Sequence, residues 1–281
     1  MTWEGRPRSE IGGLACLVAG LSTGSAVVLL HGVGLRAEAW GAQLDAFPRC
    51  CIVAPDLPGH GQSAVLQGPS RLGAYTDRIA RLIEVLDAPV VLLGHSMGAM
   101  IALDLAARRP ELCRGVAALN AIFRRPPQAA AAIRARSRAL AGALSEGGAV
   151  DPSATLARWF GTDLESAPAR ACGAWLRSAP RAGYSAAYAV FAEEDGPSDR
   201  ALATLSCPAL FLTGAQDPNS TPAMSKAMAA LVPDGEAVVV TGAAHMMPMT
   251  HPTAVNATLA AFLDRCEAGR AAHRVAQGSS D

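Results

Sequence analysis

Three side chains that are far apart in the sequence, Ser96, Asp217 and His245, have the types and the chain order of a site that activates a hydroxyl group. A serine hydroxyl is a weak nucleophile until a neighbouring base accepts its proton, and that base needs an acid to orient it. His245 is the candidate base and Asp217 the candidate acid, because each comes shortly after a predicted strand. The set predicts attack on a carbonyl carbon.

The segment around Ser96 predicts a strand, a sharp turn and a helix. Val90–Leu93 is a short β-branched apolar run, and an apolar-periodic helix follows the turn. A turn this tight strains the backbone of the serine and brings strand and helix close together, which explains the glycines two residues before and after it. The arrangement predicts a nucleophile elbow.

Two backbone N–H groups are candidates for stabilising negative charge on a substrate oxygen. Met97 begins the helix after Ser96, so its N–H lies at the positive end of the helix dipole. The glycine-rich loop His31–Gly34 follows an earlier strand and leaves the Val33 N–H exposed. We predict that Val33 and Met97 form an oxyanion hole.

The other histidines and acids near predicted strand ends have simpler structural interpretations. His31 and His60 lie in glycine-flanked loops and are expected to brace them. Asp56 precedes a Leu-Pro-Gly turn and is expected to brace it. His251 precedes a proline at the start of the last helix, and helix packing is expected to occupy it.

Composition narrows the class of partner. The 24 basic and 24 acidic residues cancel, so no basic surface for nucleic acid is indicated. With 51% hydrophobic and 17% charged residues, the chain is typical of a soluble α/β domain. Neither a metalloprotease motif nor a phosphate-binding glycine motif is present. We therefore expect a small-molecule substrate, no metal and no cofactor.

One apolar stretch, residues 11–30, superficially resembles a signal peptide because it follows Arg6 and Arg8. Ser22–Ser25 interrupts the stretch, which favours a hairpin of two strands at 14–19 and 26–30. We therefore expect a cytoplasmic protein without a membrane segment.

The pattern of strands and helices divides the chain into three parts. Residues 1–120 predict the first part of an α/β core, with a poorly ordered lead-in over 1–10. Residues 121–200 lack strand patterns and predict a helical lid. Residues 201–281 predict the second part of the core, with a final helix over about 252–266 and a disordered tail from about residue 268.

Aromatic and basic side chains of the lid and of the loop after Gly34 are candidate substrate contacts. The aromatic candidates are Trp40, Phe123, Trp159 and Tyr188. Arginines of the lid, Arg124 and Arg125 among them, are candidates for binding a substrate carboxylate.

Five motifs carry a family resemblance over nearly the whole chain: HGVG (31–34), DLPGHGQS (56–63), GHSMG (94–98), GAQD (214–217) and GAAH (242–245). The chain resembles the α/β-hydrolase superfamily and, less specifically, its small-ester and enol-lactone hydrolases. The resemblance implies an α/β-hydrolase fold, with a mostly parallel sheet of about eight strands flanked by helices. It also implies a lid inserted after the sixth strand and a Ser96–His245–Asp217 triad.

The residues and the resemblance together predict a serine hydrolase that cleaves a small carboxylic ester or lactone through an acyl-enzyme on Ser96. Two other reactions on the same fold stay open: hydrolysis of a carbon–carbon bond, and cofactor-free oxygenase or perhydrolase chemistry with His245 as base. A small-molecule receptor that retains a vestigial hydrolase site is a third alternative.

Overall fold

Eight strands form one sheet in the computed structural model, which describes residues 3 and 5–278, with side chains as far as residue 268. The strand order is β1-β2-β4-β3-β5-β6-β7-β8, and β3 to β8 run parallel while β1 and β2 are antiparallel to their neighbours. The strands are β1 (Ser9–Ile11), β2 (Leu14–Gly20), β3 (Ser25–Leu30), β4 (Cys50–Pro55), β5 (Val90–His95), β6 (Cys113–Leu119), β7 (Ala209–Gly214) and β8 (Gly235–Val240). Because parallel strands end at the same edge, the loops after β3, β4, β5, β6, β7 and β8 meet there.

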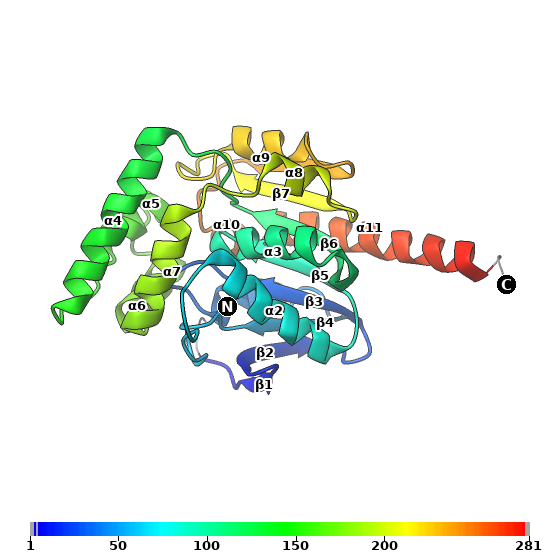
Figure 1. The fold of residues 1–281 in the computed structure, drawn as a ribbon, viewed down its shortest axis with the longest axis horizontal. Coiled ribbons are helices and arrows are strands. Elements are labelled where there is room, and N and C mark those ends of the chain that lie inside the picture. The colour runs from blue at the N-terminus through cyan, green and yellow to red at the C-terminus, as the bar shows by residue number, and fades with distance from the viewer. Residues whose placement is uncertain (1–2, 4, 279–281) are drawn as a thin grey trace.

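Both faces of the sheet are covered, which explains why its central strands are apolar throughout. Along β3, Val28 and Leu30 belong to one core cluster, while Val27 and Leu29 belong to the other. Helices α2 (Leu72–Leu86) and α3 (Met97–Arg108) pack on the first face, together with α8 (Asp199–Ala203) and α9 (Pro222–Ala229). The other face carries α1 (Gly41–Leu44) and α11 (Pro252–Gly278) (Figure 1). Short helices η1 (Ala37–Trp40), η2 (Pro110–Leu112) and α10 (Met247–Thr250) lie in the connections.

The strand-free region forms the helical lid that the sequence predicts between β6 and β7. It contains α4 (Pro127–Ser145), α5 (Ser153–Phe160), α6 (Ala167–Ser178) and α7 (Arg181–Glu193). These four helices gather at one end of the sheet, on the left in Figure 1. A Cβ at Gly59 would lie 2.6 Å from the Gly183 Cα, so glycine at both positions lets α7 contact a core loop backbone to backbone. No helix among the described residues is both long and apolar enough to span a bilayer.

The two strands predicted as a hairpin form, but they do not pair with each other. β4 lies between them: β2 pairs with β4 antiparallel, and β3 pairs with β4 parallel. Directly after β2, the Leu21 N–H donates to the Cys50 carbonyl at 2.9 Å, which ties the turn to the start of β4. The hairpin prediction is therefore wrong. Spacing along the chain indicates that two strands exist, but it does not determine which strands they pair with.

The end of the chain also differs from expectation. α11 continues to Gly278, whereas the sequence predicts a helix end near Cys266 and disorder from about residue 268. The segment after Cys266 is rich in alanine and arginine, which are strong helix formers, so the helix can continue without an apolar periodicity.

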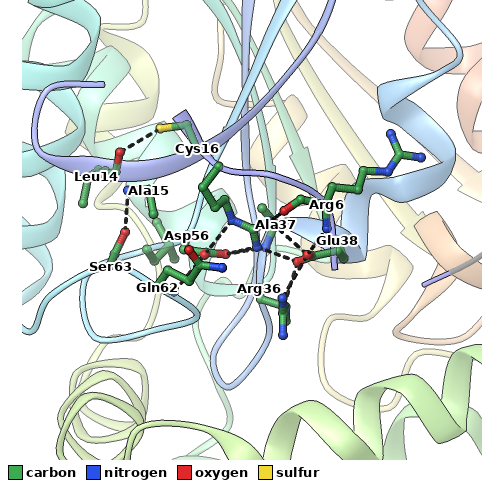
Figure 2. A network of polar contacts seen from close by, with 12 residues as sticks. Arg6, Leu14, Ala15, Cys16, Arg36, Ala37, Glu38, Asp56, Gln62 and Ser63 are labelled. Atoms are coloured by element: carbon green, nitrogen blue, oxygen red, sulfur yellow. Dashed lines mark hydrogen bonds and ion pairs between the residues drawn. The ribbon is translucent and has the colours of Figure 1, made fainter. Parts of the chain in front are cut away.

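The lead-in, predicted to be poorly ordered, contributes a buried cation. The Arg8 guanidinium contacts Glu38 at 2.7 Å and Asp56 at 3.0 Å, and all three side chains are at least 95% buried. Figure 2 shows Glu38 and Asp56 in one polar network with Ala37 and Gln62. Arg8 meets acids 30 and 48 residues further along the chain, a pairing that local sequence cannot predict.

Replacing Arg8 with methionine is expected to lower the free energy of unfolding by about 3–5 kcal/mol at neutral pH, because the buried carboxylate of Asp56 loses its ion pair and that of Glu38 keeps only Arg36. Burial acts to raise the pKa of Glu38, but Arg8 and Arg36 outweigh it and lower that pKa from 4.5 to about 2. A lowered pKa contributes stability above pH 4.5 that is lost as the pH falls towards about 2. The loss in free energy of unfolding caused by Arg8→Met should therefore be smaller at acid pH than at neutral pH. Urea unfolding at neutral and at acid pH measures the difference.

Arg6→Met is the matched control, since Arg6 pairs with Asp45 at the surface and exposed pairs contribute about 1 kcal/mol or less. A cost for Arg8→Met as small as the control, or one that does not change with pH, would contradict the role given to the buried network.

Candidate active site

The turn between β5 and α3 has the strained geometry that the sequence predicts. Ser96 has φ 55° and ψ −116°, a conformation that non-glycine residues rarely adopt. A Cβ at Gly94 would lie 2.6 Å from the Ala99 Cα, and one at Gly98 would lie 2.7 Å from the His31 carbonyl oxygen. Strand, helix and the loop after β3 can therefore approach only because both positions are glycine.

Asp217 and His245 meet at the same edge of the sheet. Asp217 follows β7, His245 follows β8, and the His245 Nδ1–H donates to the Asp217 Oδ2 at 2.7 Å. Both side chains are buried. With Nδ1 as the donor, a neutral imidazole keeps its Nε2 unprotonated, which is the state that a general base requires.

Three hydrogen bonds hold the Asp217 carboxylate in its charged form. Besides His245, the Asn219 N–H donates to it at 2.8 Å and the Asn120 Nδ2–H at 2.7 Å. Burial acts to raise the pKa of Asp217, but His245 and these donors outweigh it and lower the pKa to about 2. The carboxylate is therefore ionised at neutral pH and can stabilise a charged imidazolium.

Asn120 is a site residue that the sequence did not point to. It directly follows β6 and has φ 51°, and its carbonyl accepts the Ser220 hydroxyl at 2.7 Å. The signal in the sequence was its place at the end of a parallel strand. Because asparagine cannot act as the acid of a triad, that signal did not suggest a role. Its role as a donor to Asp217 depends on the fold.

A cavity between the sheet edge and the lid brings these groups together. From the core, its walls include Gly32, Val33, His95, Ser96 and His245; from the lid, they include Ile133, Arg136, Arg158, Trp159, Tyr184 and Tyr188. The Trp159 ring stacks on the His245 imidazole, with centroids 5.8 Å apart and an interplanar angle of 28°. Ser96, His245, Trp159 and Tyr188 thus line one cavity.

The other two aromatic candidates lie elsewhere. Trp40 is 1% exposed in the core beneath the sheet, where its ring meets the His95 ring edge-on. Phe123 is 2% exposed in the opposite core cluster, with Arg124 over its ring. Both predictions of a cavity wall fail because large rings following a strand end can be buried in either core layer, and sequence position does not choose between core and cavity.

Both candidate oxyanion donors lie beside Ser96. A Cβ at Gly32 would lie 3.2 Å from the Ser96 Cβ, so the loop carrying Val33 runs against the serine. Met97 is the first residue of α3, where an N–H has no acceptor within the helix. Among the described residues, the Val33 N–H also has no hydrogen-bond partner.

The arginines that reach the cavity are not those singled out from the sequence. Arg124 pairs with Asp199 at the surface, and Arg125 binds Asp195 and backbone carbonyls. Arg136 of α4 and Arg158 of α5 line the cavity instead. Helical periodicity can indicate which face of each lid helix packs against its neighbours. It does not indicate which lid helices cover the active site.

Neither cavity arginine has an acidic partner within the part of the chain that the structure describes. Arg136 has a buried Nε without a hydrogen-bond partner, and Arg158 donates only to the Thr155 hydroxyl, at 3.1 Å. Burial, together with the charge of Arg136, lowers the pKa of Arg158. Both guanidinium side chains thus line the cavity without an acidic partner among the described residues, and guanidinium groups bind carboxylates through paired hydrogen bonds.

Three further histidines, His31, His60 and His95, bond backbone groups. The His31 and His60 rings lie 5.2 Å apart between two core loops. His251 bonds the Thr250 hydroxyl at 2.9 Å and does not line the cavity. His95 donates its Nε2–H to the His245 carbonyl at 2.8 Å, and burial lowers the pKa of His95 to about 3, so it stays neutral.

A metal site is not found in the described part of the chain, where no group of three or more His, Cys, Asp or Glu side chains could hold an ion. The cavity carries a serine, a hydrogen-bonded histidine–aspartate pair and free backbone N–H groups. These groups can transfer an acyl group without further help.

Residues 27–258 match the model of the alpha/beta hydrolase family. The chain belongs to this family. The fold predicted from the sequence is confirmed, with eight strands and a lid after the sixth.

Three relatives of this α/β hydrolase are informative. It is 36% identical over 244 residues to (E)-2-((N-methylformamido)methylene)succinate hydrolase of Acinetobacter baylyi, covering 86% of this chain and 91% of that protein. The structure of an esterase from Thermogutta terrifontis with malate bound is 28% identical, with a TM-score of 0.79 over 93% of this chain and 99% of that one. The structure of E-2-(acetamidomethylene)succinate hydrolase is 25% identical, with a TM-score of 0.73 over 92% and 98% of the two chains.

Proposed function

We propose that this α/β hydrolase cleaves a carboxylic ester or amide in a small substrate that itself carries one or two free carboxylates. The observation that carries the proposal is the pair Arg136 and Arg158, which face Ser96 and His245 across one cavity without an acidic partner among the described residues. The ester or lactone predicted from the sequence belongs to the same class of acyl transfer, and the arginines add the requirement for a carboxylate.

The first half of the reaction forms an acyl-enzyme. His245 Nε2 accepts the Ser96 hydroxyl proton as Oγ attacks the substrate carbonyl carbon, and the N–H groups of Val33 and Met97 bind the oxygen that becomes negative. Asp217 stabilises the imidazolium through Nδ1. His245 then gives its proton to the leaving alcohol or amine, and Ser96 retains the acyl group.

The second half releases the acid. Water loses a proton to His245 Nε2 and attacks the ester carbonyl on Ser96, and the same two N–H groups bind the second oxyanion. Collapse of that intermediate returns the proton to Ser96 Oγ and frees the carboxylic acid. Every proton passes through His245, so no cofactor is required.

The names of the relatives support a carboxylated substrate. Two of them are hydrolases of substituted succinates, which carry two carboxylates and an amide, and the third is an esterase with the dicarboxylate malate bound. A pair of arginines suits such ligands, because each guanidinium can bind a carboxylate through two parallel hydrogen bonds.

Arg158→Gln and Arg136→Gln are expected to lower kcat/KM for p-nitrophenyl hydrogen succinate by about 10- to 150-fold each. This range follows from the 1.5–3 kcal/mol of a hydrogen bond to a charged group. The neutral ester p-nitrophenyl acetate lacks the carboxylate, so its hydrolysis should change by less than about two-fold. Initial rates on the two esters measure the difference.

Arg138→Gln is the matched control, since Arg138 lies exposed on the same helix as Arg136 and does not line the cavity. An equal loss of kcat/KM on both esters would contradict recognition of a carboxylate. A loss of kcat/KM in Arg138→Gln as large as in the two cavity variants would contradict it as well.

A further inference from the structure

The loop Asp56–Ser63 lies outside the cavity, yet it supplies hydrogen-bond partners to the loop that carries Val33. We propose that three side chains, Asp56, His31 and His60, position the Val33 N–H for the oxyanion. This inference rests on the proposed function, in which Val33 is an oxyanion donor. The two histidines are positioning residues, because neither touches the reacting atoms.

His31 fixes the peptide unit to which the Val33 N–H belongs. Its Nε2 accepts the Leu57 N–H at 2.9 Å, and its Nδ1–H donates to the Gly32 carbonyl at 2.8 Å. The Leu35 N–H donates to the same carbonyl at 3.2 Å. In a trans peptide the carbonyl of Gly32 and the N–H of Val33 point in opposite directions, so holding one fixes the direction of the other.

His60 fixes the next peptide unit in the same way. Its Nε2 accepts the Gly34 N–H at 3.0 Å, and its Nδ1–H donates to the Pro58 carbonyl at 3.1 Å. Both imidazoles therefore carry the proton on Nδ1 and use Nε2 as an acceptor. Burial lowers the pKa of His31 and, together with His31, lowers that of His60 to about 3, so both remain acceptors at neutral pH.

The buried acid Asp56 holds the two loops together at their other end. Its Oδ1 accepts the Ala37 N–H at 2.9 Å, and its Oδ2 accepts the Gln62 N–H at 2.9 Å (Figure 2). A Cβ at Gly61, where φ is +51°, would lie 2.6 Å from the Asp56 Oδ1, so only glycine lets the loop wrap around the carboxylate. The segment from Asp56 to Gln62 thus supports the segment from His31 to Ala37.

The decisive variants change the hydrogen bonds of residue 60. His60→Leu removes both the Nε2 acceptor and the Nδ1–H donor, whereas His60→Gln keeps a polar acceptor at the position of Nε2. We expect His60→Leu to lower kcat on p-nitrophenyl hydrogen succinate by about 10- to 100-fold, below the full 10²- to 10³-fold loss of an oxyanion donor. His60→Gln should recover most of that loss.

Two inhibitors separate positioning from general damage to the site. A trifluoromethyl ketone binds as a tetrahedral oxyanion, so its affinity should fall with kcat in His60→Leu. Succinate forms no tetrahedral adduct with Ser96, and in the proposed function Arg136 and Arg158 bind its carboxylates, so its inhibition constant should not change. Ser63→Ala is the matched control: it removes a hydrogen bond of the same loop to the Ala15 N–H at 3.0 Å, on the side of β2, and should affect neither inhibitor.

A second measurement needs no variant. Long-range ¹H–¹⁵N NMR of the wild-type protein should show the Nδ1-protonated neutral form for His31 and His60 at neutral pH. His60 should keep this form down to about pH 5, where an ordinary histidine would be charged. An imidazolium or an Nε2-protonated ring at neutral pH would overturn the proposal, even if His60→Leu failed to fold.

Three other results would also overturn the proposal. They are an equal loss of affinity for both inhibitors in His60→Leu, no recovery of kcat in His60→Gln, and a kcat for His60→Leu as high as that for Ser63→Ala. If Ser96→Ala abolishes turnover while His60→Leu does not lower kcat, the positioning role fails and the proposed function stands. If Ser96→Ala is fully active, the proposed function fails first.

Discussion

Replacing Ser96 with alanine is expected to lower kcat for ester hydrolysis by about 10⁴- to 10⁶-fold, the range for loss of a nucleophile that acts as a unit with its base. The variant keeps Val33, Met97 and both cavity arginines, so KM should change little. Stopped-flow or initial-rate assays on p-nitrophenyl hydrogen succinate measure kcat, and equilibrium binding of succinate checks that the cavity is intact.

Ser225→Ala provides the control, because Ser225 is buried and its hydroxyl has no partner among the described residues. It should retain the activity of the wild type. Ester hydrolysis that persists in Ser96→Ala at more than about 1% of the wild-type rate would contradict an acyl-enzyme on Ser96. If Ser96→Ala instead still turned over a different substrate in a reaction with molecular oxygen, the result would favour base chemistry at His245. That is the cofactor-free reaction left open from the sequence.

Asp217→Asn is expected to lower kcat by about 10⁴-fold while preserving the fold. An amide at this position can donate to His245 Nδ1, which favours the tautomer with the proton on Nε2 and removes the lone pair that Ser96 needs. It also leaves the imidazolium without a charged partner. The Asn219 N–H, which lies 2.8 Å from Oδ1, keeps its acceptor in this variant, because the amide nitrogen takes the place of Oδ2.

The same substitution has a signature in stability. Because the pKa of Asp217 is lowered from 3.8 to about 2, the wild type gains stability from this group above pH 3.8 and loses it as the pH falls towards about 2. Acid unfolding of Asp217→Asn should lack that part of the pH dependence. Asp163→Asn, an exposed lid aspartate, is the control for both readouts. Full activity of Asp217→Asn would contradict the role of Asp217 as the orienting acid.

Those features that depend on local sterics are predictable from the sequence. The turn at Ser96 follows from Gly94 and Gly98, which sit where a Cβ would meet backbone. The convergence of Ser96, Asp217 and His245 follows from the parallel direction of β5, β7 and β8, since side chains after such strands share one edge. These parts of the fold and of the site needed no knowledge of tertiary contacts.

Features that depend on long-range partners were not predictable. The sequence predicts that Arg8 belongs to a poorly ordered terminus, whereas the fold buries it between Glu38 and Asp56. The sequence also predicts that β2 pairs with β3, whereas β4 lies between them. The orientation of the lid decides that Arg136 and Arg158 face the cavity while Arg124 and Arg125 bind acids and carbonyls elsewhere. Amphipathic patterns indicate that helices pack, but not which charged side chain is left without a partner.

Covalent labelling with a fluorophosphonate tests the nucleophile most directly. Trypsin releases the peptide Leu82–Arg108, in which Ser96 is the only serine and neither threonine, tyrosine nor cysteine occurs. We predict a single phosphonylated peptide, this one, in the wild-type protein, and no label in His245→Ala. An active wild-type enzyme that takes no label, or takes it on any other peptide, would contradict a reactive hydroxyl at Ser96.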